Sequence, residues 1–264
     1  MIAVIGAGKM GEALVSGLLR AGTSPDELLI TERYEERAQE LSARYGVKAV
    51  SNADAARQAE TLVLAVKPQD MDALLVELAA VVTPDRLIVT IAAGITTSAI
   101  EKRLVAGVPV VRVMPNTPAL VGEAMSAVAA GSHASPDHLS RAEDLFRPVG
   151  KVVRLPESQL DAVTALSGSG PAYVFYLVEA MTDAGILLGL PRAIAHELIV
   201  QTVFGSAVML RDSGEHPVAL REAVTSPAGT TIAAIRELEN HGVRAAFLSA
   251  LEAARDRSRE LAGQ

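Results

Sequence analysis

Two hydrophobic patterns divide this chain of 264 residues. From residue 2 to about residue 153, short β-branched runs alternate with longer amphipathic stretches, which is typical of βα units around a parallel sheet buried on both faces. We expect strands at residues 2–5, 28–31, 47–50, 62–66, 87–91, 109–113, 125–129 and 151–154, and helices at about 10–20, 34–44, 52–58, 69–79, 97–103 and 136–146. This alternation predicts an α/β fold with a doubly wound sheet of the Rossmann type.

After about residue 157 the β-branched runs stop, and an Ala- and Leu-rich helical pattern continues to the C-terminus. The chain contains four Phe, four Tyr and no Trp. We therefore expect these helices to pack through small aliphatic side chains. Such helices can approach closely enough to intertwine with a second copy. We therefore expect a dinucleotide-binding domain at residues 1–156 and an all-α domain at residues 157–264 that binds substrate and forms a homodimer. The alternative is a monomer whose helices cover the sheet.

Composition narrows the function classes. The 24 Lys and Arg against 31 Asp and Glu give a net charge of −7, which argues against nucleic-acid and membrane-surface partners. No cysteine is present, so any redox chemistry needs a cofactor. The long charge-free run between Asp161 and Glu179 contains two glycines and a proline, which argues against a membrane span. The five histidines form no metal-like cluster. We expect a soluble, unprocessed, cytoplasmic protein without a metal.

A glycine-rich loop follows the first expected strand and opens the first expected helix. It reads Gly6-Ala7-Gly8-Lys9-Met10-Gly11, the fingerprint of a dinucleotide site. Gly6 permits a tight turn, Gly8 lets the backbone approach a pyrophosphate, and Gly11 lets helix and strand pack closely. The helix N-terminus adds N–H groups and a partial positive charge for the phosphates.

Two further strand ends carry candidate cofactor ligands. Glu32 lies roughly 20 residues past the last fingerprint glycine, where an acidic side chain accepts a hydrogen bond from the ribose of NAD. Arg33 follows, and a guanidinium there favours the 2′-phosphate of NADP instead. Glu32 and Arg33 therefore favour different cofactors, and the sequence does not decide between NAD and NADP. Ala65-Val66-Lys67-Pro68 ends the fourth expected strand at the same edge of the sheet, which makes Lys67 a ligand candidate.

Five segments together resemble the pyrroline-5-carboxylate reductase family, over residues 2 to about 255. They are Gly6–Gly11, Ala65–Pro68, Met114-Pro115-Asn116-Thr117-Pro118, Leu166-Ser167-Gly168-Ser169-Gly170-Pro171-Ala172-Tyr173 and Thr225-Ser226-Pro227-Ala228-Gly229-Thr230-Thr231. The resemblance implies NAD(P)H-dependent reduction of 1-pyrroline-5-carboxylate to L-proline, the last step of proline biosynthesis, in a homodimer or a ring of dimers. It also implies that Asn52 approaches the adenosine end of the cofactor, and that Ala92, Ala93, Asn116 and Pro118 line the nicotinamide end.

The segment from Ser226 to Thr231 is the candidate substrate site. It precedes an amphipathic helix expected at about 230–240, so free N–H groups and the hydroxyls of Ser226 and Thr230 can hold a carboxylate beside Gly229. Thr231 is the candidate catalytic residue, with its hydroxyl near the ring nitrogen, although threonine is too weak an acid to be the sole proton source. Plain helix capping by Ser226 or Thr230 is the alternative. Ala228 stands where the family usually has a second glycine, and alanine tolerates positive φ less well.

Other interpretations remain open. Ser167–Pro171 interrupts an apolar helical stretch, either for close backbone approach beside the active site or for packing alone. A related β-hydroxyacid, imine or ketone reductase is one rival, although such enzymes place a lysine in the helical half and residues 157–264 contain none. A non-catalytic NAD(P)H sensor is the other, and it has no need of the segment from Ser226 to Thr231.

Overall fold

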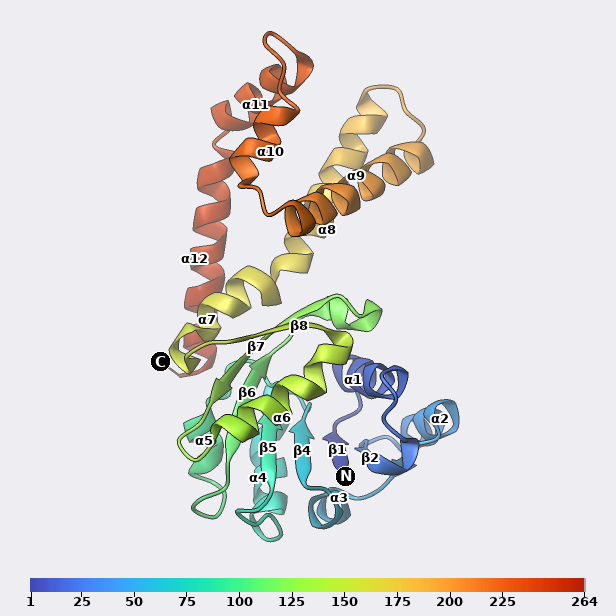
Figure 1. The fold of residues 1–264 in the computed structure, drawn as a ribbon, viewed down its shortest axis with the longest axis vertical. Helices are drawn as coiled ribbons and strands as arrows, with labels where there is room; N and C mark the ends of the chain where they lie inside the picture. The colour runs from blue at the N-terminus through green and yellow to red at the C-terminus, as the bar shows by residue number, and fades with distance from the viewer. Residues whose placement is uncertain (264) are drawn as a thin grey trace. The chain divides into compact units, whose positions relative to one another are not determined.

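The structure is a computed structural model, and it describes residues 1–263. The chain forms two compact units (Figure 1). The first holds residues 1–169 together with the end of the last helix from Ala254 onward, and the second holds residues 170–253. Residues 157–169 are mostly helical, as the pattern predicts, but belong to the first unit. The functional boundary at residues 156 and 157 stays a prediction.

An eight-stranded sheet forms the centre of the first unit, in the order β3-β2-β1-β4-β5-β6-β7-β8. All neighbouring pairs are parallel except β6 with β7. The predicted doubly wound α/β fold is confirmed, and the observed bounds lie within a few residues of the predicted ones. The strands are β1 (Ile2–Ile5), β2 (Leu28–Thr31), β3 (Lys48–Ala49), β4 (Thr61–Leu64), β5 (Leu87–Thr90), β6 (Val110–Met114), β7 (Ala124–Ala130) and β8 (Gly150–Arg154).

Helices cover both faces of this sheet, because successive residues of each buried strand point to opposite sides. Val4 of β1 packs into the cluster that includes Leu14, Leu41 and Phe146, whereas Ile5 packs into the cluster on the other face. The first face is covered by α1 (Lys9–Arg20), α2 (Glu35–Tyr45) and α6 (Pro136–Phe146). The second is covered by α3 (Asn52–Gln58), α4 (Met71–Ala79) and α5 (Thr97–Glu101).

The remaining helices follow β8. They are α7 (Leu160–Val163), α8 (Gly170–Leu187), α9 (Arg192–Ser213), α10 (Pro217–Ala223), α11 (Thr230–Asn240) and α12 (Val243–Leu261). Leu160 of α7 is fully buried against Met114 and strand β7. The end of α12 is fixed to the first unit because the Ser258 hydroxyl donates to Asp161 at 2.7 Å, with both residues buried.

The predicted interruption at Ser167–Pro171 takes a form that the sequence did not indicate. Residues Thr164–Gly168 form one turn of π-helix, and α8 begins at Gly170. Pro171 therefore lies in the first turn of a helix, where its missing N–H removes no intrahelical hydrogen bond. The interruption therefore lies at the π-helical turn before α8, and Pro171 fits the helix that follows.

Candidate functional site

The predicted cofactor residues meet at one edge of the sheet. Strands β1, β2, β4, β5 and β6 run parallel, so the segments after them leave the sheet at the same side. These segments contain the glycine loop, Glu32, Ala65–Pro68, Ala92 and Asn116. Ligands of open α/β sheets bind at this edge.

The glycine loop has the geometry of a phosphate cradle. Gly6 has a φ of +89°, and its N–H donates to the Thr31 carbonyl at 3.0 Å. A Cβ on Gly11 would collide with the carbonyl oxygen of Gly6, so only glycine lets α1 start this close to the turn. Gly8 lies at the N-terminus of α1, with no side-chain cap and open space where a Cβ would stand. The loop therefore offers free N–H groups to an anion, and a dinucleotide fits it.

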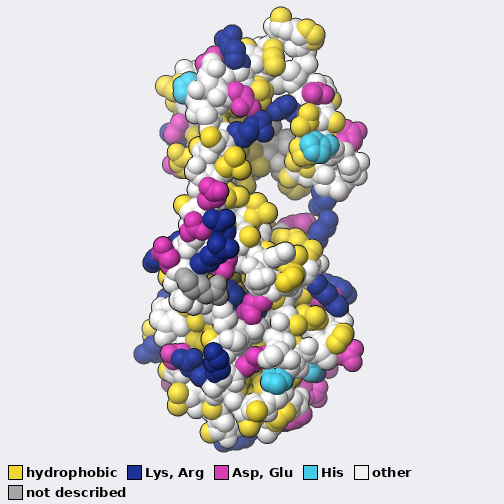
Figure 2. Space-filling view, turned by 90° about the vertical axis from the view of Figure 1, so that its left-hand side faces the viewer, with side chains coloured by type: hydrophobic (Ala, Val, Ile, Leu, Met, Phe, Trp, Pro, Cys, Tyr) yellow, Lys and Arg dark blue, Asp and Glu magenta, His cyan; other side chains and the backbone are white. Residues whose placement is uncertain are grey.

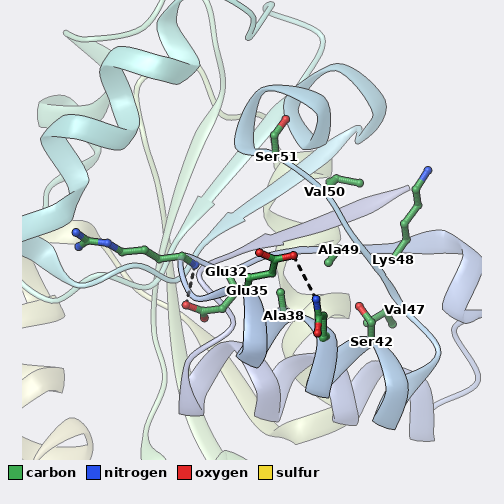
Figure 3. A pocket seen from close by; sticks show the side chains of 11 residues that line it. Glu32, Glu35, Ala38, Ser42, Val47, Lys48, Ala49, Val50 and Ser51 are labelled. Carbon is green, nitrogen blue, oxygen red and sulfur yellow. Dashed lines mark hydrogen bonds between the residues drawn. The ribbon is translucent and has the colours of Figure 1, made fainter.

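The ribose position keeps both of its charged candidates. Glu32 is half-buried, and one of its carboxylate oxygens accepts the N–H of Arg33 at 2.8 Å. The Arg33 guanidinium is exposed and forms no ion pair within residues 1–263. Beside them an open pocket of about 630 Å³ lies between α2 and residues 47–51, with Glu32, Glu35, Lys48 and Ser51 in its lining (Figure 3). Arg33 is thus free for a phosphate, while Glu32 is partly engaged.

An ion-pair network fixes α1 against α2 next to this position. Glu12 in the first turn of α1 accepts from Arg44 at 2.8 Å and from the Tyr45 hydroxyl at 2.9 Å, and it also pairs with Arg37. Arg37 donates to Glu40 as well, and this hydrogen bond lowers the pKa of the Glu40 carboxyl. The network joins the first turn of α1, directly after the glycine loop, to both halves of α2.

Lys67 and Asn52 differ in which of their polar groups are already engaged within the protein. Lys67 is exposed, ends the segment after β4 and forms no ion pair in the described chain, so its ammonium is available to a phosphate. The Asn52 amide instead donates to Glu77 at 2.9 Å. That contact leaves the Asn52 amide oxygen without a hydrogen bond among residues 1–263.

The expected nicotinamide end is built from two loops. Ala92 is buried and its N–H donates to the Thr90 hydroxyl at 3.3 Å, whereas Ala93 is exposed. Asn116 is committed to the protein itself, because its amide nitrogen donates to the Ser167 carbonyl at 3.1 Å and its amide oxygen accepts the Met125 N–H at 2.9 Å. Asn116 therefore connects the end of β6 to the π-helical turn. Nothing in the sequence indicated this contact.

The predicted carboxylate loop lies in the helical unit. Ala228 has a φ of +58°, and Gly229 is the N-terminal cap of α11, with no side-chain hydrogen bond to the helix end. The N–H groups of Thr230 and Thr231 donate to no acceptor within residues 1–263. The capping alternative for Ser226 and Thr230 is therefore wrong. This helix end keeps its donors for a ligand.

Metal ligands and membrane-spanning helices are two further features that bear on function. Within residues 1–263 no group of three or more His, Asp or Glu could hold a metal ion. One helix, α9, is long and apolar enough to cross a membrane by length and composition alone, and a single helix of this kind is weak evidence for a span.

Strand order and glycine loop define a dinucleotide-binding oxidoreductase of the Rossmann class, and residues 1–94 match the family described as NADP oxidoreductase, coenzyme F420-dependent. Residues 157–261 match the family described as pyrroline-5-carboxylate reductase dimerisation. A pyrroline-5-carboxylate reductase of Corynebacterium melassecola is 48% identical over 98% of each chain. The chain belongs to the pyrroline-5-carboxylate reductase family.

Solved structures agree. A pyrroline-5-carboxylate reductase of Coxiella burnetii superposes with a TM-score of 0.93 at 38% identity, covering 98% of this chain and 97% of the other. The Plasmodium falciparum enzyme, solved with NADP bound, has a TM-score of 0.89 at 28% identity and covers 99% and 97%. These comparisons confirm the predicted family, an oxidoreductase with an NAD(P)-type cofactor, and a homo-oligomer. The monomer alternative is not supported.

Proposed function

We propose that this enzyme reduces 1-pyrroline-5-carboxylate to L-proline, with the substrate carboxylate bound by the loop from Ser226 to Thr231. The observation that carries the assignment of the loop is the uncapped N-terminus of α11, whose first N–H groups remain free behind Gly229. A carboxylate at a helix N-terminus gains hydrogen bonds and a favourable dipole interaction. The hydroxyls of Ser226 and Thr230 add donors at the same place.

The first unit holds the cofactor. Gly6–Gly11 binds the pyrophosphate, Glu32 or Arg33 the ribose, Asn52 and Ala65–Pro68 the adenosine side, and Ala92, Ala93, Asn116 and Pro118 the nicotinamide side. When bound, NAD(P)H supplies a hydride, and with it two electrons, to the carbon of the C=N bond. Asn116 serves this end by fixing the loop after β6, because both ends of its amide are engaged within the protein.

Thr231 acts at the ring nitrogen. Hydride addition at carbon leaves the nitrogen with an electron pair and requires one proton in total to give the amine of proline. Thr231 is half-buried and its hydroxyl makes no hydrogen bond within the described residues, so it is free to bond this nitrogen. Because a threonine hydroxyl is a weak acid, the proton comes from water or from a substrate already protonated, and Thr231 orients the nitrogen that carries it.

The proposal includes the functional division at residue 157, with cofactor binding before it and substrate binding and dimerisation after it. It also includes a cytoplasmic location, where a reductase finds NAD(P)H.

Steady-state oxidation of NADPH and of NADH with 1-pyrroline-5-carboxylate tests the reaction and the site together. We expect turnover by the wild type, a loss of about 10²-fold in Thr231→Ala, and near wild-type activity in Thr231→Ser, which keeps the hydroxyl. A loss below about threefold in Thr231→Ala would remove Thr231 from the chemistry. Tight NADPH binding without any turnover would instead support the sensor. The ratio of the two cofactors tells whether Arg33 or Glu32 governs the ribose.

A further inference from the structure

A charged side chain is buried in the middle of the sheet. Arg112 of β6 is 3% exposed and lies beside Thr90 of β5 in the strand register. Its Nη1 pairs with the carboxylate of Glu157 at 3.3 Å, while its Nε and Nη2 are buried with no partner among residues 1–263. Burying a charged guanidinium costs free energy unless its N–H groups are paired, and two nitrogen atoms of Arg112 are not. This cost indicates that Arg112 has a role beyond packing.

The partner carboxylate is fully engaged by a different element. Glu157 accepts the backbone N–H of Thr97 at 2.8 Å on one oxygen and the Thr97 hydroxyl at 2.6 Å on the other. Thr97 is the first residue of α5 and is 3% exposed. The Glu157 carboxylate therefore lies at the positive end of α5, with Arg112 behind it.

The loop of residues 91–96 ends directly before Thr97, the residue that Glu157 binds. At its start, the Ala92 N–H is held by the Thr90 hydroxyl. In its middle, Gly94 has a φ of +74°, and a Cβ there would lie 3.4 Å from the carbonyl oxygen of Leu261 at the end of α12. The loop is therefore hydrogen-bonded at its start and at its end, and its middle lies beside the end of α12.

We propose that Glu157 is a positioning residue for the reductase reaction, which fixes the loop of residues 91–96 through Thr97 and is itself oriented by Arg112. The proposal rests on the proposed function, in which Ala92 and Ala93 of this loop line the nicotinamide end of the cofactor. Glu157 touches neither substrate nor cofactor. It acts by holding the backbone against which the nicotinamide is placed, and small displacements at such a position change hydride transfer strongly.

The first test uses the cofactor-free full-length protein. Glu157→Gln keeps the shape of the side chain and removes its charge. Hydrogen exchange of the peptide covering residues 91–99 should become at least about fivefold faster in this variant, while exchange in strand β4 stays unchanged. Thr97→Val removes only the hydroxyl donor and should give a smaller increase in the same peptide, which keeps the test usable if Glu157→Gln is poorly folded.

The matched control is Glu143→Gln. Glu143 is likewise a glutamate paired with arginine, here Arg147 and Arg154, but it lies on α6 and has no hydrogen bond or ion pair to the loop among residues 1–263. We expect this variant to lose stability without faster exchange in residues 91–99. Equal acceleration of that peptide in Glu143→Gln and Glu157→Gln would mean that Glu157 only stabilises the fold, and would overturn the proposal.

The second test measures the hydride step. With cofactor deuterated at the transferred position, Glu157→Gln should show a larger isotope effect on kcat and a kcat lower by about tenfold, with KM for 1-pyrroline-5-carboxylate within about twofold. Partial unfolding lowers kcat without changing the isotope effect. An unchanged isotope effect in Glu157→Gln therefore also refutes the proposal.

One more variant separates this proposal from the site assignment on which it rests. Ala93 is exposed, so Ala93→Val enlarges the loop surface without disturbing the core. It should raise KM for NADPH and the isotope effect. If Ala93→Val leaves both unchanged, the loop is not at the nicotinamide end and the positioning role falls with it. If wild-type protein fails to turn over, the proposed function itself is wrong, whatever the exchange data show.

Discussion

The two units differ in how far they bury their large hydrophobic side chains. In the first unit the large side chains of the strands are buried, with Ile5, Leu29 and Leu64 at 1% exposure or less. In the described residues of the helical unit, Ala195 and Ile199 are the buried hydrophobic residues, whereas Phe175, Tyr176 and Leu188 are 67%, 75% and 84% exposed. Figure 2 shows hydrophobic side chains on the outside of this unit.

This difference shows which part of the fold one chain can complete. The side chains of the sheet pack against residues 1–152 of the same chain on both faces. The helical unit, which matches a dimerisation family, also carries an open apolar groove of about 410 Å³ between α11 and α12, lined by Ile235, Leu238 and Phe247 among others. Exposed apolar surface of this extent is typical of an interface. The hydrophobic pattern of the helical unit is therefore satisfied only in the homo-oligomer.

The largest expected effect comes from placing a charge on the exposed face of α9. Phe204 is 63% exposed in the single chain, and Phe204→Asp should raise the dissociation constant of the oligomer at least about 10³-fold, because a large apolar contact is lost and a charge is buried. Sedimentation over a range of concentrations measures this. Val76→Asp on α4 is the matched control, since Val76 is 74% exposed but lies in the first unit. An oligomer that survives Phe204→Asp, or that Val76→Asp dissociates, contradicts the comparison.

A smaller effect is expected within the first unit. Glu143, with its side chain 8% exposed, pairs with Arg147 at 2.9 Å and with Arg154, and the hydrogen bond from Arg154 lowers the pKa of its carboxyl from the ordinary 4.5. Glu143→Gln should lower the free energy of unfolding at pH 7 by roughly 2 kcal/mol. Urea unfolding of the full chain measures the loss, which should not depend on protein concentration because the pair lies within one chain.

The pH dependence of that loss has a definite sign. A lowered pKa in the folded state means that the ionised carboxylate adds stability above pH 4.5, and that this stability disappears as the pH falls through the folded-state pKa. The difference between wild type and Glu143→Gln should therefore be constant above pH 4.5 and shrink below it. A difference that persists unchanged in acid would assign the effect to packing rather than to charge.

The smallest effect concerns the helical unit's loop. Ala228 is the one non-glycine residue among residues 1–263 with positive φ, and L-residues pay about 1–2 kcal/mol for that conformation. Ala228→Gly should raise the free energy of unfolding by roughly 0.5 kcal/mol, once the greater freedom of glycine in the unfolded chain is included. Ala233→Gly, inside α11, is the control of opposite sign and should cost about 1 kcal/mol. Thermal unfolding of the two variants measures both, and a destabilised Ala228→Gly would contradict the strain.

The sequence predicted the features that depend on residues close together in the chain. Helices at residues 52–58, 136–146 and 230–240 have the predicted bounds, because Ser51, Ser135 and Gly229 mark their starts. The alternation of β-branched runs with amphipathic stretches predicted a parallel sheet. The edge of the sheet at which the cofactor residues lie could therefore be predicted as well. Strand β4 ends at Leu64 rather than at residue 66, and Ala65 and Val66 lie close to the turn at Gly6.

What the sequence did not predict are contacts between distant segments. The sequence placed Asn116 beside the cofactor, but it did not indicate that the Asn116 amide also joins Met125 to Ser167. Arg112 stands among valines in a buried strand, yet its partner Glu157 lies 45 residues later, beyond the reach of any periodicity. The sequence predicted that the helical half forms a homodimer, but it did not indicate which side chains stay exposed in one chain, because a helix that packs on its own chain and one that packs on a second copy have the same hydrophobic pattern.

The buried bond between Ser258 and Asp161 has a consequence for synthesis on the ribosome. The dinucleotide-binding unit starts at residue 1, but it receives its final element only when α12 returns from the helical unit. Domains usually fold in the order of translation. Here the unit that begins first is completed last: the two faces of the sheet can be covered by residues 1–149, but Asp161 must wait for nearly the whole polypeptide before Ser258 reaches it.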